Sequence, residues 1–117
     1  MEILGTTLRI CVDDLDASVA FYERLAGAQA HRFDRGGVSV AAVGCFLLMS
    51  GPAAEIDVLR KVAATIAVAD IDEAGAVLSA SGAQIVAGPV ATPAGRTLIA
   101  LHPDGSVFEY ADRKAGA

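Results

Sequence analysis

Two stretches of the chain alternate apolar and polar residues, end in acidic residues and start 56 positions apart. The first covers residues 6–16 (TTLRICVDDLD) and the second covers residues 62–72 (VAATIAVADID). Alternation with a period of two is typical of a β-strand that buries one face. Each stretch runs into a segment whose apolar residues recur at helical spacing, in residues 15–26 and 71–81. The pattern therefore predicts a strand, a turn and a helix that occur twice.

Short β-type runs follow each predicted helix, after a glycine, Gly27 or Gly82, that ends it. The runs span residues 28–34, 38–42 and 45–50 in the first half, and residues 84–91, 96–101 and 106–111 in the second. The turns between them are Arg35-Gly36-Gly37, Gly44, Pro93-Ala94-Gly95 and Pro103-Asp104-Gly105. The order βαβββ is thus predicted for residues 5–51 and again for residues 62–112. Residues 52–61 connect the halves, with Pro52 as a breaker and a helical turn at residues 53–59.

The length and composition fit one globular domain that spans residues 1–117. A single domain commonly takes about 100–200 residues, and 54% of these residues are apolar whereas 20% are charged. Charged residues or glycine interrupt every apolar run before it could cross a membrane. The first residues lack the basic and apolar regions of a signal peptide, so we expect a cytoplasmic protein without a membrane partner.

Charge and cysteine content exclude further classes of function. The chain has 9 Lys and Arg against 14 Asp and Glu, which gives a formal net charge of -5. Nucleic acid is therefore not an expected partner, because binding phosphates requires clustered basic residues. A cationic small ligand suits this charge better. The two cysteines, Cys11 and Cys45, are too few for a disulfide framework or a zinc cluster, and we expect both to be buried thiols.

Two longer motifs carry a resemblance to a known family over nearly the whole chain. Residues 12–27 (VDDLDASVAFYERLAG) resemble a strand followed by a D-L-x-x-S-x-x-F-Y helix and a closing glycine. Residues 93–109 (PAGRTLIALHPDGSVFE) resemble a G-R hairpin, a D-P-D-G-N turn and a strand that ends in glutamate. With both motifs in order, the sequence is similar to the vicinal oxygen chelate superfamily of glyoxalases, bleomycin resistance proteins and extradiol dioxygenases. The resemblance implies an α+β fold whose tandem βαβββ units form a curved mixed sheet around a cavity, and it implies a homodimer.

Enzymes of this family hold a divalent metal in the cavity through ligands on the first and last strands of each half. The family's spacing, counted from the turn residues, places these positions at Thr7, Ala63, Leu48 and Glu109. Leu48 follows from counting four residues past Gly44. Of the four, only Glu109 carries a side chain that binds metals well. We therefore expect no metal and no other cofactor, with a divalent metal as the alternative.

Strand alternation predicts which side chains face the cavity. On the first strand, Arg9 and Cys11 share a face with Thr7. The other positions assigned to the cavity are Phe46, Leu48 and Ser50, then Ala63, Thr65 and Ala67, and finally Val107, Glu109 and Ala111. The positions assigned to the helix side are Leu8, Ile10 and Val12, Leu47 and Met49, Ile66 and Val68, and Phe108 and Tyr110. The predicted cavity is a mostly apolar cup with one arginine and one glutamate.

The polar residues of this cup have two interpretations each. Arg9 and Glu109 either pair with each other or bind a ligand. In the second case, Arg9 binds a carboxylate or phosphate of the ligand, and Glu109 binds an amine or hydroxyl of the ligand. Phe46 either stacks on a flat ligand or belongs to the core. The predicted ligand-binding residues are Thr7, Arg9, Phe46, Leu48, Ala63, Thr65, Val107 and Glu109. Outside the cup, we expect Arg96, at the mouth of the hairpin, to be solvated or to bond to its turn rather than to recognise a ligand.

The acidic residues at the two strand-to-helix turns have a structural interpretation. The pairs are Asp13 with Asp14 and Asp70 with Asp72. Aspartate at such a turn caps the following helix and interacts favourably with its dipole. We therefore expect these carboxylates to be helix caps rather than catalytic groups.

Two main functions are compatible with the sequence. We favour a metal-free protein that binds a cationic or aromatic small molecule, similar to the family's antibiotic-resistance branch, which sequesters antibiotics or natural products. The alternative is a lyase, isomerase, epimerase or dioxygenase with an atypical metal site, or with Glu109 as a catalytic acid or base. An accessory subunit without a ligand is a third possibility.

Overall fold

The computed structural model describes residues 1–92 and 95–114 and divides into two compact units. The first-half unit consists of Thr7–Lys61. The second-half unit consists of Val62–Ala117 together with Met1–Thr6. Of the predicted Pro93-Ala94-Gly95 turn, Pro93 and Ala94 lie outside the described residues.

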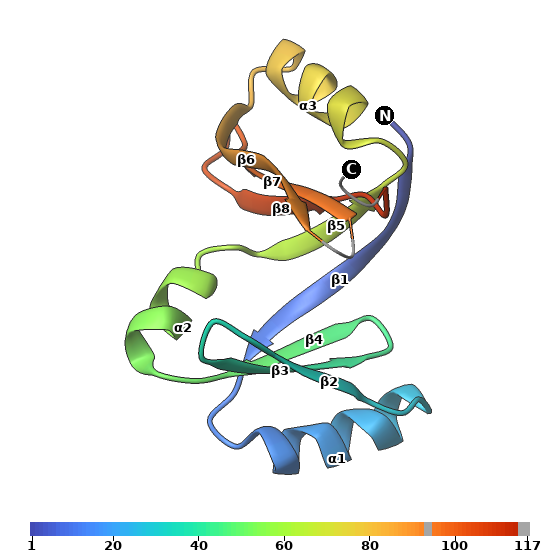
Figure 1. Ribbon diagram of the computed structural model, residues 1–117, viewed down its shortest axis with the longest axis vertical. Helices are drawn as coiled ribbons and strands as arrows, with labels where there is room; N and C mark the ends of the chain where they lie inside the picture. The colour runs from blue at the N-terminus through green and yellow to red at the C-terminus, as the bar shows by residue number, and fades with distance from the viewer. Residues whose placement is uncertain (93–94, 115–117) are drawn as a thin grey trace. The chain divides into compact units, whose positions relative to one another are not determined.

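The first-half unit has the predicted βαβββ order followed by a short connecting helix (Figure 1). Its elements are β1 (Ile3–Cys11), whose residues from Thr7 onward belong to this unit, α1 (Leu15–Ala26), β2 (His31–Arg35), β3 (Val38–Val43), β4 (Phe46–Ser50) and α2 (Ala53–Leu59). The strands lie in the order β2-β3-β4-β1, with β1 parallel to β4 and the other neighbours antiparallel. Asp14 caps α1 by accepting a hydrogen bond from the Ala17 N–H, and Gly27 ends the helix in the left-handed conformation with φ 64°.

The second-half unit repeats this order. Its elements are β5 (Ala64–Val68), α3 (Ile71–Ala80), β6 (Gln84–Thr92), β7 (Gly95–Leu101) and β8 (Val107–Ala111). The strands lie in the order β5-β8-β7-β6, and β5 is parallel to β8 whereas the other neighbours are antiparallel. Asp70 caps α3 by accepting from the N–H groups of Asp72 and Glu73. The α+β class, the tandem βαβββ order and the capping role of Asp14 and Asp70 are therefore confirmed.

Each unit packs its long helix on one face of its strands (Figure 1). The core under α3 contains Val68, Ile71, Ala74, Leu78, Leu98, Ala100 and Tyr110, with Ile66 and Phe108 partly buried against it. The core under α1 contains Val19, Ala41, Val43 and Leu48, with Ile10, Tyr22 and Phe46 partly buried against it. Burial of these apolar side chains is the main favourable term that holds each helix on its strands.

The expected orientation of β4 is wrong. Phe46 and Leu48 pack under α1, and Leu48 is fully buried there, whereas Leu47 and Met49 lie on the opposite face. The β3–β4 connection leaves two residues between the paired Val43 and Phe46. The β7–β8 connection is one residue longer, because three residues separate His102 from Ser106, whose backbones bond to each other. The same number of residues counted from Gly44 and from Gly105 therefore reaches positions that differ by one residue between β4 and β8. A difference of one residue places a side chain on the opposite face of a strand.

The register identifies the residue of the first half that matches Glu109. Arg9 pairs with Leu47 across β1 and β4, and Thr65 pairs with Glu109 across β5 and β8. Leu47, not Leu48, is thus the counterpart of Glu109. Cys45 departs from expectation too, because it is exposed in the β3–β4 turn while Cys11 is half-buried.

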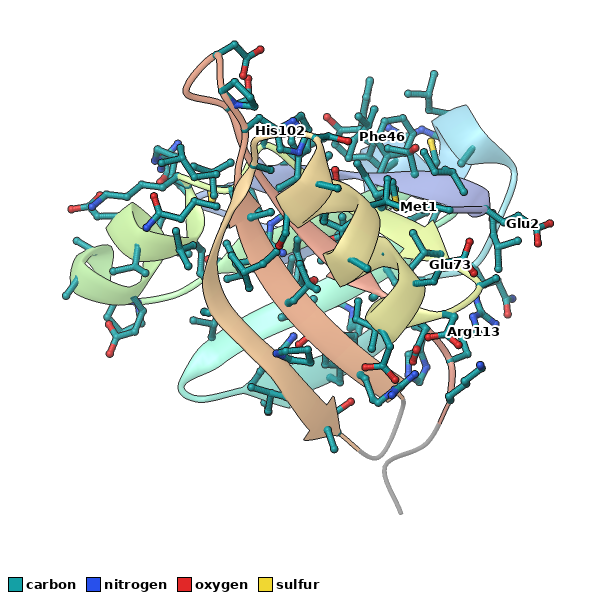
Figure 2. The ribbon with its side chains drawn as sticks, turned by 90° about the horizontal axis from the view of Figure 1, so that it is seen from above. Met1, Glu2, Phe46, Glu73, His102 and Arg113 are labelled. Atoms are coloured by element: carbon teal, nitrogen blue, oxygen red, sulfur yellow. The ribbon has the colours of Figure 1, made fainter. Side chains whose placement is uncertain are left out.

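No helix among residues 1–92 and 95–114 is long and apolar enough to cross a membrane. The amino terminus is held in the second-half unit, where the Met1 ammonium group lies 3.0 Å from Glu73 Oε1 on α3. Figure 2 shows Met1 and Glu73 side by side at this helix.

Candidate functional site

The candidate site lies on the face of the second-half unit that is opposite α3. Phe108 and Tyr110 pack into the core under α3, so Glu109 between them points to the other face. Glu109 stands on β8 between Thr65 of β5 and Ile99 of β7, which are its direct register partners. The Thr65 hydroxyl donates a hydrogen bond of 3.1 Å to Glu109 Oε1. Both side chains are half-buried.

The surroundings of this pair on the same strands are uncharged. Along β8 the neighbours on the same face are Val107 and Ala111, and along β5 the neighbour is Ala67. Ala63 immediately precedes β5, and its N–H donates to the Val107 carbonyl at 2.8 Å. The fold thus brings together four of the predicted ligand-binding residues: Ala63, Thr65, Val107 and Glu109. Their binding role stays a prediction.

The matching face of the first-half unit is mostly apolar, and α2 covers part of it. Val38, Val40 and Met49 are buried there under Ile56 of α2, with Cys11, Leu47 and Leu59 partly buried beside them. Thr7 and Arg9 of β1 are half-buried, and Arg9 shares the face of its register partner Leu47. Phe46 and Leu48 are removed from this face by the register of β4, so they are core residues rather than ligand contacts.

A cluster of ion pairs at the start of α3 was not foreseen from the sequence beyond the turn-bonding role of Arg96. The Asp112 side chain is fully buried just after β8. It accepts from the Ile71 N–H at 2.8 Å, from the Arg96 N–H at 3.1 Å and from Arg96 Nη2 at 2.7 Å. Burial raises the pKa of Asp112, but these hydrogen bonds outweigh it and lower the pKa to about 2.

The same cluster continues toward the solvent. Arg96 Nη1 also pairs with Asp72 at 2.9 Å, and Lys114 Nζ pairs with Asp70 at 2.8 Å. The hydrogen bond with Lys114 is the main cause that lowers the pKa of Asp70, and the bonds of Arg96 with Asp112 and Asp72 raise the pKa of its guanidinium group. Because charges of both signs already satisfy one another, the cluster joins β7, β8 and α3 and is not a ligand site.

His102 is half-buried and lies against aromatic side chains of the second-half unit. Its Nε2 lies 2.8 Å from the Tyr110 hydroxyl, and its ring centroid lies 4.7 Å from that of Phe108. Burial raises the pKa of Tyr110. The imidazole therefore interacts with the hydroxyl of a buried tyrosine.

A cavity of about 670 Å³ is present in the first-half unit at the start of α1. Asp13, Asp14, Asp16 and Arg32 are among the residues that line it. Asp14 is occupied as the cap of α1, and Asp16 forms an ion pair of 2.6 Å with Arg32. Asp14 thus has the capping role that the sequence indicated, and Asp16 is paired with Arg32.

The positions implied for a divalent metal do not fit one. Glu109 supplies a carboxylate, but its counterpart in the first half is Leu47, and the first-strand positions hold Thr7 and Ala63. Protein sites for such ions use several carboxylate, imidazole or thiolate donors. Within the part of the chain that the structure describes, no group of three or more His, Cys, Asp or Glu residues could hold a metal ion.

Comparison with known proteins gives a family and a set of similar structures. The sequence model of the Glyoxalase/Bleomycin resistance protein/Dioxygenase superfamily matches residues 4–110. No curated protein matches the chain. A crystal structure of an uncharacterized protein from Methanosarcina mazei is similar over 97% of this chain and 95% of its own, with 35% identity and a TM-score of 0.90.

More distant structures share the fold. Methylmalonyl-CoA epimerase from Mycobacterium tuberculosis has a TM-score of 0.69 at 20% identity, over 98% of this chain and 90% of its own. Methylmalonyl-CoA epimerase from Streptomyces coelicolor, in complex with 2-nitronate-propionyl-CoA, has a TM-score of 0.70 at 21% identity, over 97% of both chains.

Proposed function

Because the chain belongs to the glyoxalase, bleomycin resistance protein and dioxygenase superfamily, we propose that it binds a small organic molecule on the Glu109 face of the second-half unit, without a catalytic metal. The observation that carries this proposal is a carboxylate on an otherwise uncharged face, half-buried and bonded to Thr65. A carboxylate beside apolar side chains is costly unless it has polar partners, and the Thr65 hydroxyl is one of them. The negative net charge of -5 favours a cationic ligand.

The first experiment measures binding and metal content together. We expect protein purified without chelator to contain no stoichiometric manganese, iron, nickel or zinc. We expect cationic or aromatic natural products, antibiotics among them, to raise its melting temperature if they bind the folded state. Glu109→Gln should weaken such binding about 10- to 100-fold, which is the usual effect of losing a charged hydrogen bond.

A matched control comes from the same unit. Glu2 is exposed, and its backbone carbonyl accepts a hydrogen bond from the Ala69 N–H. Glu2→Gln removes the same charge and should leave binding unchanged. Stoichiometric bound metal, or equal affinity in Glu109→Gln and the parent protein, would contradict the proposal.

A second candidate function is acid–base catalysis by Glu109. The specific observation in its favour is that the Thr65 hydroxyl holds this carboxylate on an uncharged face, where a base could meet a carbon acid. Methylmalonyl-CoA is a suitable probe, since two structures of this fold are epimerases of that compound. Deuterium uptake from heavy water that Glu109→Gln abolishes would favour catalysis, whereas no uptake favours binding alone.

We further propose that the protein forms a homodimer. Phe21 and Leu25, four residues apart on α1, are 52% and 60% exposed in the single chain, and exposed apolar side chains of this size often mark contact surfaces. Light scattering on protein eluted from a size-exclusion column measures its molecular mass directly. The mass of a monomer at micromolar concentration would contradict the proposed homodimer.

A further inference from the structure

We infer that the cavity at the start of α1 binds a guanidinium group, and that this group contacts the carboxylates there as Arg96 does at the start of α3. The cavity belongs to the first-half unit and has a volume of about 670 Å³. The residues that line it are separate from the Glu109 face, so the site goes beyond the proposed function and is independent of it.

In the second-half unit, an arginine of the chain itself lies between the start of the helix and the end of the last strand. Arg96 Nη1 lies 2.9 Å from Asp72 Oδ2. Arg96 Nη2 lies 2.7 Å from Asp112 Oδ2 and 3.5 Å from Asp70 Oδ1. A guanidinium group suits this place because its five N–H donors lie in one plane and reach several carboxylates at once.

The carboxylates that contact Arg96 on α3 have counterparts on α1. Asp14 and Asp70 are the N-caps of the two helices, and Asp16 and Asp72 stand two residues further along the chain. Asp14 and Asp16 both line the cavity. The start of α1 therefore offers the same two acidic positions as the start of α3.

A serine stands at the position that matches Arg96. Ser50 is the counterpart of Asp112 by the register between the first and last strands, and it pairs with Ser39 of β3. In the second half, the Asp112 N–H donates to the Arg96 carbonyl, so Arg96 has the place of Ser39. Ser39 and Ser50 also line the cavity. A serine side chain is too short to occupy the space that an arginine side chain would fill.

The lining of the cavity carries an excess of negative charge. It contains four carboxylates and one cation, Arg32 of β2. The carboxylates are those of Asp13, Asp14, Asp16 and Asp34. At the start of α3, by contrast, three carboxylates share two cations, Arg96 and Lys114. Because like charges that lie close together repel, a cationic ligand is favoured at α1.

Arg32 does not take the place of Arg96. It comes from β2 rather than β3, and the side chains of its ion pair with Asp16 are 47% and 86% exposed. Arg96 is 23% exposed and pairs with a fully buried Asp112. The exposed carboxylate of Asp16 is accessible to a ligand beside Arg32, since a carboxylate accepts about four hydrogen bonds.

The cavity suits a molecular cation rather than a metal ion. Among residues 1–92 and 95–114, no group of three or more His, Cys, Asp or Glu residues could hold a metal ion. A volume of about 670 Å³ is typical of sites for small organic molecules, which take about 300–1,000 Å³. The guanidinium group therefore belongs to a larger ligand.

Three probes with the same four-carbon chain test the site. Butylguanidinium and butylurea both end in a planar group with N–H donors, but only the first is charged, and butylammonium is charged without the planar group. Titrations followed by protein NMR at low ionic strength give the dissociation constants and locate the shifted signals. We expect butylguanidinium to bind at least about tenfold more tightly than either other probe, with shifts at residues 13–16 and at Ser39. Binding of butylammonium or butylurea that is equally tight would overturn the inference, and so would the absence of saturation at about 10 mM.

Two further probes distinguish the sources of the group. Agmatine represents a free small molecule, and N-acetylarginine methylamide represents an arginine side chain of a peptide. Binding of either at the cavity supports the site, and the tighter of the two identifies the source. Failure of both would overturn the inference.

The sharpest variant supplies the missing arginine within the chain. Ser39→Arg places a guanidinium group at the position that matches Arg96, and Ser39 is exposed. We expect this variant to weaken butylguanidinium binding at least about tenfold and to raise the melting temperature, because the internal group competes for the same carboxylates. The matched control is Ser79→Arg, which adds the same charge at an exposed position of α3 and should leave binding unchanged. Unchanged binding in Ser39→Arg would overturn the inference.

A second variant removes a carboxylate and does not depend on the first. Asp16→Asn keeps the shape of the side chain and should weaken butylguanidinium binding about tenfold. The control is Asp57→Asn on α2, since Asp57 is exposed in the same unit and lies outside the lining of the cavity. If Glu109→Gln weakens the probe and Asp16→Asn does not, the probe binds the Glu109 face and the cavity is not its site. Far-ultraviolet circular dichroism checks that each variant is folded.

Discussion

The two halves of the chain have the same βαβββ order and the same register between their first and last strands but differ on the face opposite the long helix. In the second half this face carries Thr65 and Glu109, which bond to each other. In the first half the matching residues are Arg9 and Leu47, and the face holds an apolar cluster under Ile56 of α2. The two halves therefore share a backbone arrangement, whereas the side chains on the face opposite the long helix differ in polarity and charge.

The connecting helix α2 explains part of this difference. It follows β4 directly (Figure 1), whereas residues 112–114, the part after β8 that the structure describes, contain no helix. The helix buries Ile56 to 7% exposure against Val38, Val40 and Met49. A covered apolar face contributes stability, whereas a polar face left open can bind a ligand. Under the proposed function, the first-half face stabilises its unit and the second-half face binds the ligand.

The two halves also differ in the hydrogen bonds that join the end of the last strand to the start of the helix. The register makes Ser50 the counterpart of Asp112, because Met49 and Ala111 occupy matching positions beside Cys11 and Ala67. The Ser50 hydroxyl donates to the Asp13 carbonyl at 3.3 Å, which is a single exposed bond. Asp112 instead accepts from Ile71 and Arg96 in a buried site. The second half thus has the stronger connection next to its candidate site.

The largest expected effect tests the register on which the comparison depends. Leu48→Ala should lower the free energy of unfolding by about 3–4 kcal/mol, because the side chain is fully buried under α1. Leu47→Ala should cost only about 1 kcal/mol, since Leu47 is half-buried. Urea denaturation of both variants measures the difference. If Leu47→Ala is the more damaging change, Leu48 faces away from α1 and the assignment of Leu47 as the counterpart of Glu109 is wrong.

The second-largest expected effect compares the side-chain bonds of Asp112 and Ser50 at the two helix starts. Asp112→Asn should lower the free energy of unfolding by about 2–4 kcal/mol, because it removes a buried charge that pairs with Arg96. Ser50→Ala should cost at most about 1 kcal/mol, since its bond is exposed. Denaturant melts of the two variants provide the comparison. Equal losses would show that the ion pairs at α3 do not strengthen the second half beyond the first.

Much of the fold could be predicted from the sequence, because its signals are local. Helical spacing predicted α1 over Leu15–Ala26 without error, and the acidic turns predicted the caps at Asp14 and Asp70. Pro52 and the apolar residues after it indicated α2. Each of these features depends on residues within one or two turns of chain, so no knowledge of distant contacts was required.

The site was only partly predictable for two physical reasons. The orientation of β4 depends on a turn that is one residue shorter than that of β8, and both turns contain a glycine, so glycine counting could not detect the difference. Asp112 had no local signal at all, since its partner Arg96 is 16 residues away. Only the pairing of β7 with β8 brings the two side chains together.

The smallest expected effect is a pH dependence that belongs to the second half alone. The pKa of Asp112 is lowered from 3.8 to about 2 in the folded protein, so its ionised form favours the folded state. The resulting stability is present in full above pH 3.8 and is lost as the pH falls toward 2; this shift corresponds to about 2 kcal/mol. Urea melts at pH 5, 3.5 and 2.5 should therefore show a steeper decline for the parent protein than for Asp112→Asn. Asp70 and Asp104, whose pKa values are lowered too, remain in both proteins. Parallel declines would mean that the buried carboxylate does not contribute the expected part of the acid sensitivity, and Ser50→Ala, which changes no charge, should follow the parent curve at every pH.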